Sequence, residues 1–178
     1  KYLEECRAHF KKLGRVTIKR PLKGLRIKFY GPVGTSGYSK VCRDIIESLY
    51  SNSTNLDLYF EPVQFQNYSL DFVEQGNVLL SSLAGEETIY DYIVIHSTPE
   101  LWPAICKRER KHNSNVIIYG ISVWETETLP LEWEKYCKFV DKVSVPSKFS
   151  SKAFISKKIP VDVVHHPVIQ MGNSVSSC

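Results

Sequence analysis

A regular alternation of apolar segments and longer amphipathic segments constrains the fold of this chain most strongly. The apolar segments predict strands at residues 25–30, 56–63, 90–96, 116–122, 140–146 and 161–166. Helical periodicity lies between them, at residues 38–50, 98–111, 129–139 and 147–158. Strands separated by helices of this length form βαβ units, and such units build a parallel sheet with helices on both faces. The sequence therefore predicts an α/β fold with a Rossmann-like, doubly wound parallel sheet.

The remaining residues set the expected domain organisation. Residues 64–90 fit no single pattern: 69–76 are typical of a short helix and 77–83 of a short strand. The amino-terminal part, residues 1–23, predicts an extra helix followed by a basic connector, and residues 169–178 predict a polar linker or frayed tail. We expect one Rossmann-like domain at 24–168.

Basic residues are concentrated near the beginning of the chain. Residues 1–28 contain ten of the 23 Lys and Arg residues and only two acids. A basic arm of this kind can contact phosphates, anionic lipid or nucleic acid, although a solvated helix face gives the same pattern. We expect no nucleic-acid partner, and peripheral membrane contact through the arm stays open.

The cysteines and the hydropathy favour a cytoplasmic setting. The five cysteines have no CxxC spacing, which argues against a disulfide framework and against a zinc site. No apolar run approaches the ~20 residues that span a bilayer. The charged first turns do not resemble a signal peptide.

Three polar segments follow predicted strands. They are GPVGTSG at 31–37, HSTPE at 96–100 and SVWETET at 122–128. Ligands of open α/β sheets bind outside the carboxyl ends of the strands, so these segments are expected to share one edge.

The glycine-rich segment has the spacing GxxGxxG. Glycine allows backbone N–H groups to approach a ligand, and a helix that begins there attracts phosphate. The spacing is neither the dinucleotide fingerprint nor a P-loop. A tight structural turn explains the same residues equally well.

The other two segments contain candidate ligand-binding side chains. His96 ends a buried strand, where a structural hydrogen bond is the simpler interpretation. Trp124 offers a flat apolar face, and Glu125 and Thr126 offer hydrogen bonds, which together suit a polar ring-shaped ligand. Packing of Trp124 and Trp133 beneath the loop is the alternative. No zinc spacing, DxD pair or Ser-His-Asp order is present.

Three stretches in the same order resemble a known enzyme family. GPVGTSGYSKVCRDIIESL, YGISVWETETLPLEWEKYCKFVDKVSVPSKFSSKAF and VDVVHHPV resemble segments from the amino-terminal domain of GT-B glycosyltransferases of group 1 (GT4-like). The resemblance spans 24–168. It implies two Rossmann-like domains facing a cleft, of which this chain is the acceptor-binding half. The donor-binding domain would lie in the same or another chain, and this half alone would be inactive.

The resemblance also assigns roles to individual residues. The loop near the donor phosphates would comprise Gly34, Thr35, Ser36 and Gly37. Acceptor binding would fall to His96, Trp124 and Thr126, with Glu125 as the catalytic candidate. The substrates would be a nucleotide sugar and a carbohydrate, lipid or protein acceptor, without a metal or another cofactor.

The sequence departs from the family pattern at two places. The strand end at 120–122 lacks the cleft histidine of many members, and Pro167 replaces a usual glycine. Two other functions compete with the enzyme. A non-catalytic regulatory or scaffolding module is one, and a free-standing nucleotide binder is the other. The glycine spacing weakens the latter.

Overall fold

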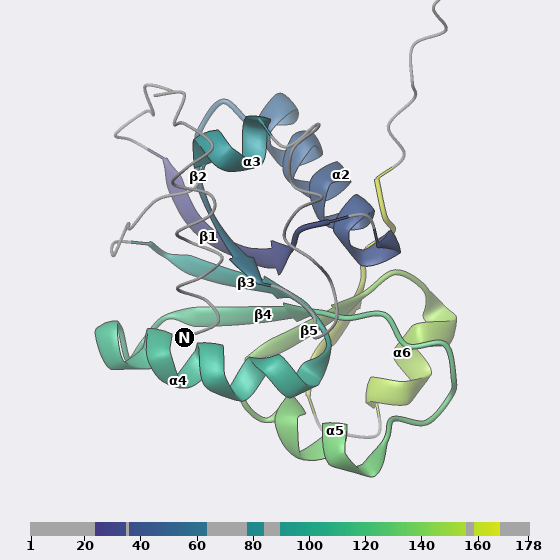
Figure 1. Ribbon diagram of the computed structural model, residues 1–178. Helices are drawn as coiled ribbons and strands as arrows, with labels where there is room; N and C mark the ends of the chain where they lie inside the picture. The colour runs from purple at the N-terminus through teal and green to yellow at the C-terminus, as the bar shows by residue number, and fades with distance from the viewer. Residues whose placement is uncertain (1–23, 35, 64–77, 84–89, 156–158, 168–178) are drawn as a thin grey trace, which may run out of the picture.

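The fold is a six-stranded, all-parallel sheet with the strand order β2-β1-β3-β4-β5-β6 (Figure 1). The computed structural model describes residues 24–34, 36–63, 78–83, 90–155 and 159–167. The strands are β1 Leu25–Pro32, β2 Leu56–Val63, β3 Tyr92–His96, β4 Ile117–Ile121, β5 Lys142–Val145 and β6 Val161–Val163. The prediction of an α/β fold with a Rossmann-like parallel sheet is confirmed.

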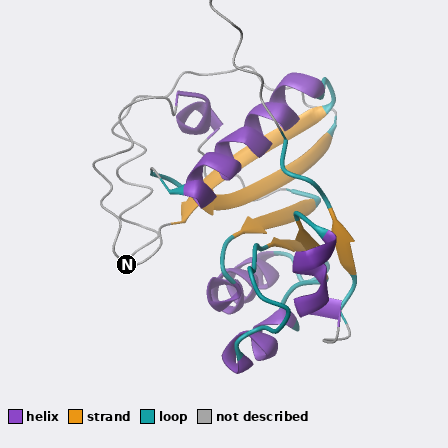
Figure 2. Ribbon diagram, turned by 90° about the vertical axis from the view of Figure 1, so that its right-hand side faces the viewer, coloured by secondary structure: helices purple, strands orange, loops and turns teal. Residues whose placement is uncertain are grey.

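Helices cover both faces of this sheet (Figures 1 and 2). They are α2 Gly37–Asn52, α3 Val78–Leu83, the 3₁₀ turn η2 Pro99–Leu101, α4 Trp102–His112, α5 Leu131–Cys137 and α6 Lys148–Ile155. The first two pack on one face, around Phe29, Cys42 and Phe60. The last three pack on the other, around Ile95, Ile118 and Phe154. This two-layer covering is the doubly wound arrangement.

Some predicted elements differ from the structure. Residues 77–83 were expected to form a strand, but Val78–Leu83 is a helix that packs on β2 and α2. A short apolar run has no reliable period, so its neighbours decide its conformation. The expected helix at 69–76, the basic arm at 1–23 and the tail at 169–178 lie outside the described residues. None of the helices within the described ranges could cross a membrane, because none is both long and apolar enough.

Strand β1 joins the two layers because its side chains alternate between the faces. Phe29 and Gly31 face α2, and a Cβ added at Gly31 would lie 2.2 Å from Sγ of Cys42. Lys28 and Tyr30 face the opposite layer. The bare glycine therefore lets α2 approach the sheet closely.

A buried network of charges fills the opposite side of β1. Glu109 of α4 accepts hydrogen bonds from the hydroxyls of Tyr30 and Tyr90. Lys28 Nζ lies 3.2 Å from Glu109 Oε1 and 3.3 Å from Glu61 Oε2. We call this group the Glu109 cluster; its members are Lys28, Tyr30, Glu61, Tyr90, Arg108 and Glu109.

The cluster pairs its charges almost completely inside the protein. Arg108 bonds both carboxylates, with Nη2 2.9 Å from Glu61 Oε1 and Nε 3.1 Å from Glu109 Oε1. Glu61 and Glu109 are 2% and 1% exposed, so water cannot replace these bonds. Burial is also the main reason that the pKa of Tyr30 is raised well above its ordinary value. The cluster thus fixes α4 against β1 and β2.

Replacing Glu109 with Gln should destabilise the fold strongly. The change leaves Lys28 and Arg108 with one carboxylate instead of two, and breaking a buried ion pair from one side costs about 3–5 kcal/mol. Urea unfolding followed by circular dichroism measures the loss. The control is Glu100→Gln, which alters an exposed carboxylate at the start of the same helical segment and should change stability by less than ~0.5 kcal/mol. Equal effects of the two variants would contradict a structural role for the cluster.

Candidate functional site

The candidate site lies where the connections of the sheet change direction. The chain runs from β1 to β2 on one side of β1 and then returns to β3 on the other side. Ligands of open α/β sheets bind at such a switch point, outside the carboxyl ends of the strands. The glycine-rich turn follows β1 and His96 ends β3, so two of the three predicted segments lie at this point.

The glycine-rich turn opens the amino end of α2. Gly34 has a φ of +124°, a conformation that favours glycine, and its carbonyl accepts a 2.9 Å hydrogen bond from Arg43 Nη1. Gly37 begins the helix, and a Cβ built there would meet nothing within 4 Å. The space beside Gly37 is therefore open. Thr35 lies outside the described residues.

Ser36 is the N-cap of α2. Its Oγ accepts a 3.1 Å hydrogen bond from the backbone N–H of Ser39. The first turn contains no acidic residue of its own, although the carboxylates of Glu100 and Glu125, from other segments, act on Tyr38. An anion that approaches Gly37 would meet backbone N–H groups and open space.

The three predicted segments meet through Tyr38. Its hydroxyl donates a 2.8 Å hydrogen bond to the carbonyl oxygen of Val123 and accepts a 3.0 Å bond from the N–H of the same residue. Its ring stacks on that of His96, with centroids 5.2 Å apart. The sequence analysis missed Tyr38, since only its position directly after the turn distinguishes it from other tyrosines.

His96 lies beneath Tyr38 and is fully buried. Neither of its ring nitrogens has a hydrogen-bond partner among the described residues. Burial, together with the nearby His166, lowers the pKa of His96 to about 3. The imidazole is therefore neutral at physiological pH, and a ligand would have to reach it by displacing its cover.

In the loop after β4, polar side chains are exposed to solvent, whereas the aromatic ring of Trp124 is packed against the protein. Residues 125–128 are exposed, and Trp124 packs on Trp133 with ring centroids 4.6 Å apart. The indole Nε1 of Trp124 donates a 2.7 Å hydrogen bond to the carbonyl of Thr128. Both tryptophans are partly buried against the core. Trp124 thus supports the loop by packing on Trp133, and it also lies beside the exposed residues that could contact a ligand. Packing and ligand binding are therefore not separate roles for this residue.

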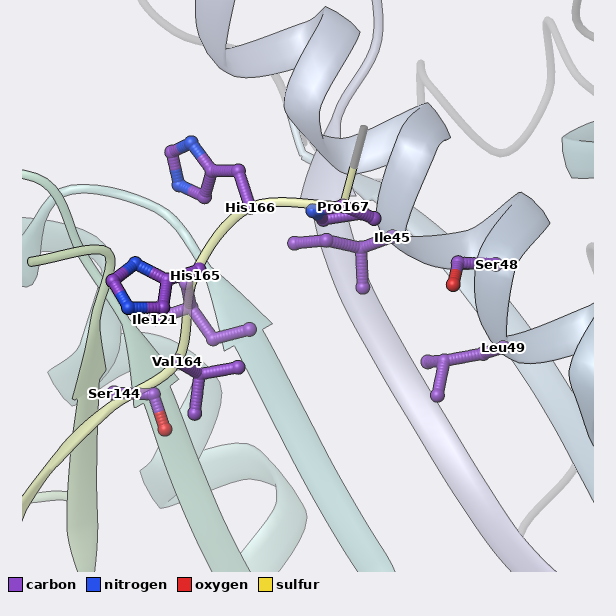
Figure 3. Close-up of a pocket in the computed structure, with 9 residues that line it drawn as sticks. All are labelled: Ile45, Ser48, Leu49, Ile121, Ser144, Val164, His165, His166 and Pro167. Atoms are coloured by element: carbon purple, nitrogen blue, oxygen red, sulfur yellow. The ribbon is translucent and has the colours of Figure 1, made fainter. Parts of the chain in front are cut away.

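A cavity opens beside this edge, between α2 and the segment that follows β6 (Figure 3). Its volume is ≈ 230 Å³, below the range of about 300–1,000 Å³ typical of ligand pockets. Its lining is mainly apolar and comprises Ile45, Ser48, Leu49, Ile121, Ser144, Val164, His165, His166 and Pro167. The pocket adjoins the carboxyl edge at two lining residues: Ile121, which ends β4, and His166, which lies near His96.

The described residues do not suggest a resident metal. Within the described ranges, no three His, Cys, Asp or Glu side chains gather as ligands. His165 and His166 follow β6 in the chain, and the former is exposed. Among the described residues, the chemistry available at the edge is that of backbone N–H groups, hydroxyls and the exposed carboxylates of Glu100 and Glu125.

Comparisons with models of known protein families, with curated proteins and with solved structures found no match to this chain.

The glycines at the two ends of the turn should respond differently to a methyl group. Gly31→Ala places a Cβ against Cys42 and should cost about 1–3 kcal/mol through overpacking. Gly37→Ala meets open space in a helical position, so its stability should stay the same or rise by up to ~1 kcal/mol. Thermal unfolding of both variants measures this difference. A destabilised Gly37→Ala would show that the helix end is closed.

The buried His96 should make stability depend on pH. Because its pKa falls from 6.5 when unfolded to about 3 when folded, the unfolded state binds more protons below pH 6.5. Stability should therefore fall as the pH falls from 6.5 toward 3, by up to about 1.4 kcal/mol per pH unit. Urea unfolding between pH 4 and 7 should show this slope reduced in His96→Leu and retained in the exposed control His112→Gln. An unchanged slope in His96→Leu would assign the effect to other groups.

Proposed function

We propose that this chain is the acceptor-binding half of a nucleotide-sugar-dependent glycosyltransferase. The observation that carries the proposal is the pairing of two features at one edge of the sheet: an open helix end suited to a diphosphate and a loop with a free carboxylate. Tyr38 joins them through Val123. The motifs that resemble group 1 GT-B enzymes fall on these two segments.

The amino end of α2 supplies the features that a diphosphate needs. Gly37 leaves the backbone accessible, Ser36 caps the first turn, and no acid lies in that turn. During glycosyl transfer, negative charge develops on the departing nucleoside diphosphate. Fixed donors that point at this charge stabilise the transition state more than the ground state. The turn would thus contribute to catalysis as well as to binding.

The loop after β4 supplies the group that would act on the acceptor. Glu125 is exposed, and no hydrogen bond or ion pair engages it among the described residues. A carboxylate in this position can accept a hydrogen bond from an acceptor hydroxyl and orient its oxygen. Thr126 lies beside it but already donates to the carbonyl of Thr128, at 2.8 Å. Glu125 is therefore the group we propose for catalysis.

The proposed reaction needs a second domain, in the same or another chain, to hold the nucleotide. The acceptor would be a carbohydrate, lipid or protein, and the transfer would require no metal. The buried free cysteines Cys42, Cys106 and Cys137 are compatible with a cytoplasmic setting for this enzyme. The competing function is a non-catalytic regulatory or scaffolding module, which would have the same fold but would not bind these substrates.

Saccharide binding to the chain tests this proposal at Glu125. We expect a saturation-transfer NMR screen of mono- and oligosaccharides to yield ligands whose affinity falls about tenfold in Glu125→Gln, since a hydrogen bond to a charged group contributes about 1.5–3 kcal/mol. The melting temperature should stay unchanged because Glu125 is exposed.

The matched control is Glu132→Gln, which removes an exposed carboxylate from the first turn of α5. It should bind saccharides like the wild type. No bound saccharide in the screen, or equal losses in the two variants, would contradict the acceptor role and favour the non-catalytic module.

A further inference from the structure

Tyr38 contacts all three segments of the carboxyl edge. It follows Gly37 directly in the chain, its ring stacks on His96 at an interplanar angle of 21°, and its hydroxyl bonds Val123 twice. Val123 directly precedes Trp124 and Glu125. One side chain thus links the glycine-rich turn to the acceptor loop, residues 122–128.

The two hydrogen bonds constrain the loop more than one bond would. The hydroxyl donates to the Val123 carbonyl at 2.8 Å and accepts from its N–H at 3.0 Å. Together they fix both the distance of this residue from α2 and the rotation of its backbone. The first turn of α2 and the loop are therefore held in one relative position by this side chain.

The Tyr38 hydroxyl is suited to holding the loop in position rather than to transferring a proton. Burial raises the pKa of Tyr38 above its ordinary value, so the group keeps its proton at physiological pH. That proton is already donated to Val123. Because proton transfer would break the contact that orients the loop, an acid–base role conflicts with the observed geometry.

We propose that Tyr38 is a positioning residue that couples a nucleoside diphosphate bound at the glycine-rich turn to the position of Trp124 and Glu125. The inference rests on the proposed function, because it takes the turn as the diphosphate site. Binding of the diphosphate changes the first turn of α2, and the Val123 contact carries that change to the acceptor loop.

NMR of the chain tests the coupling with uridine diphosphate and guanosine diphosphate as probes. The amide signals of Gly34 and Gly37 report binding at the turn, and the indole N–H signal of Trp124 reports the loop. Tyr38→Phe removes both hydrogen bonds and keeps the ring that stacks on His96. The control is Tyr50→Phe, which removes an exposed hydroxyl from the same helix. Amide hydrogen exchange at Val123 measures the contact without any ligand.

We expect the diphosphate to shift the glycine signals in all three proteins, and the Trp124 signal only in the wild type and Tyr50→Phe. The Val123 amide should exchange at least tenfold faster in Tyr38→Phe. A Trp124 response that persists in Tyr38→Phe would overturn the coupling. If neither diphosphate shifts the glycine signals, the proposed phosphate site is contradicted. In that case the exchange of the Val123 amide still tests the positioning role, and an unchanged exchange rate in Tyr38→Phe would overturn it.

Discussion

The Glu109 cluster is the constraint on which the rest of the arrangement depends. Two carboxylates and a lysine are enclosed between α4, β1 and β2, a partly exposed arginine bonds both carboxylates, and two tyrosine hydroxyls complete the hydrogen bonds. Buried charges tolerate few alternative packings, because a displaced partner leaves a charge without compensation. The helix is consequently held in one position along the sheet. Its first residue, Trp102, then lies against Gly120 of β4, where any side chain would collide with the indole at 2.6 Å.

Strand β1 transmits this constraint to the carboxyl edge. Its residues contact α4 and α2 alternately, through Tyr30 on one face and Gly31 on the other. Since Gly31 lets α2 lie close to the sheet, the position of Gly37 and Tyr38 follows from the same strand. The loop after β4 is then held by Tyr38 as well as by its own hydrogen bonds from Trp124 and Thr126 to the carbonyl of Thr128. The site geometry is thus a consequence of packing at the middle of the sheet.

The sequence predicted the parts of this protein that depend on repeated patterns. Alternating strands and helices identify a parallel sheet, and that topology alone places residues 31–37, 96–100 and 122–128 at one edge. Individual contacts between distant segments, such as Tyr38 with Val123, leave no local pattern. Glu109, in contrast, does stand in a local sequence pattern. It falls on the apolar stripe of α4 with Trp102, Ile105 and Cys106, the four buried residues of that helix, and an acid on such a stripe indicates a buried partner.

Buried polar groups are paired differently in the middle of this sheet and at its carboxyl edge. In the Glu109 cluster the carboxylates are paired from several sides, as expected for groups whose task is to hold the fold. At the carboxyl edge the opposite holds: within the described ranges, the buried nitrogens of His96, Trp102 and His166 and the hydroxyl of Thr98 lack hydrogen-bond partners. Unpaired buried polar atoms cost stability until water or a ligand satisfies them. A polyhydroxylated acceptor or a diphosphate brings the donors and acceptors that such groups lack. Under the function that we propose, a bound ligand would pair with these atoms once it displaced the side chains that cover His96.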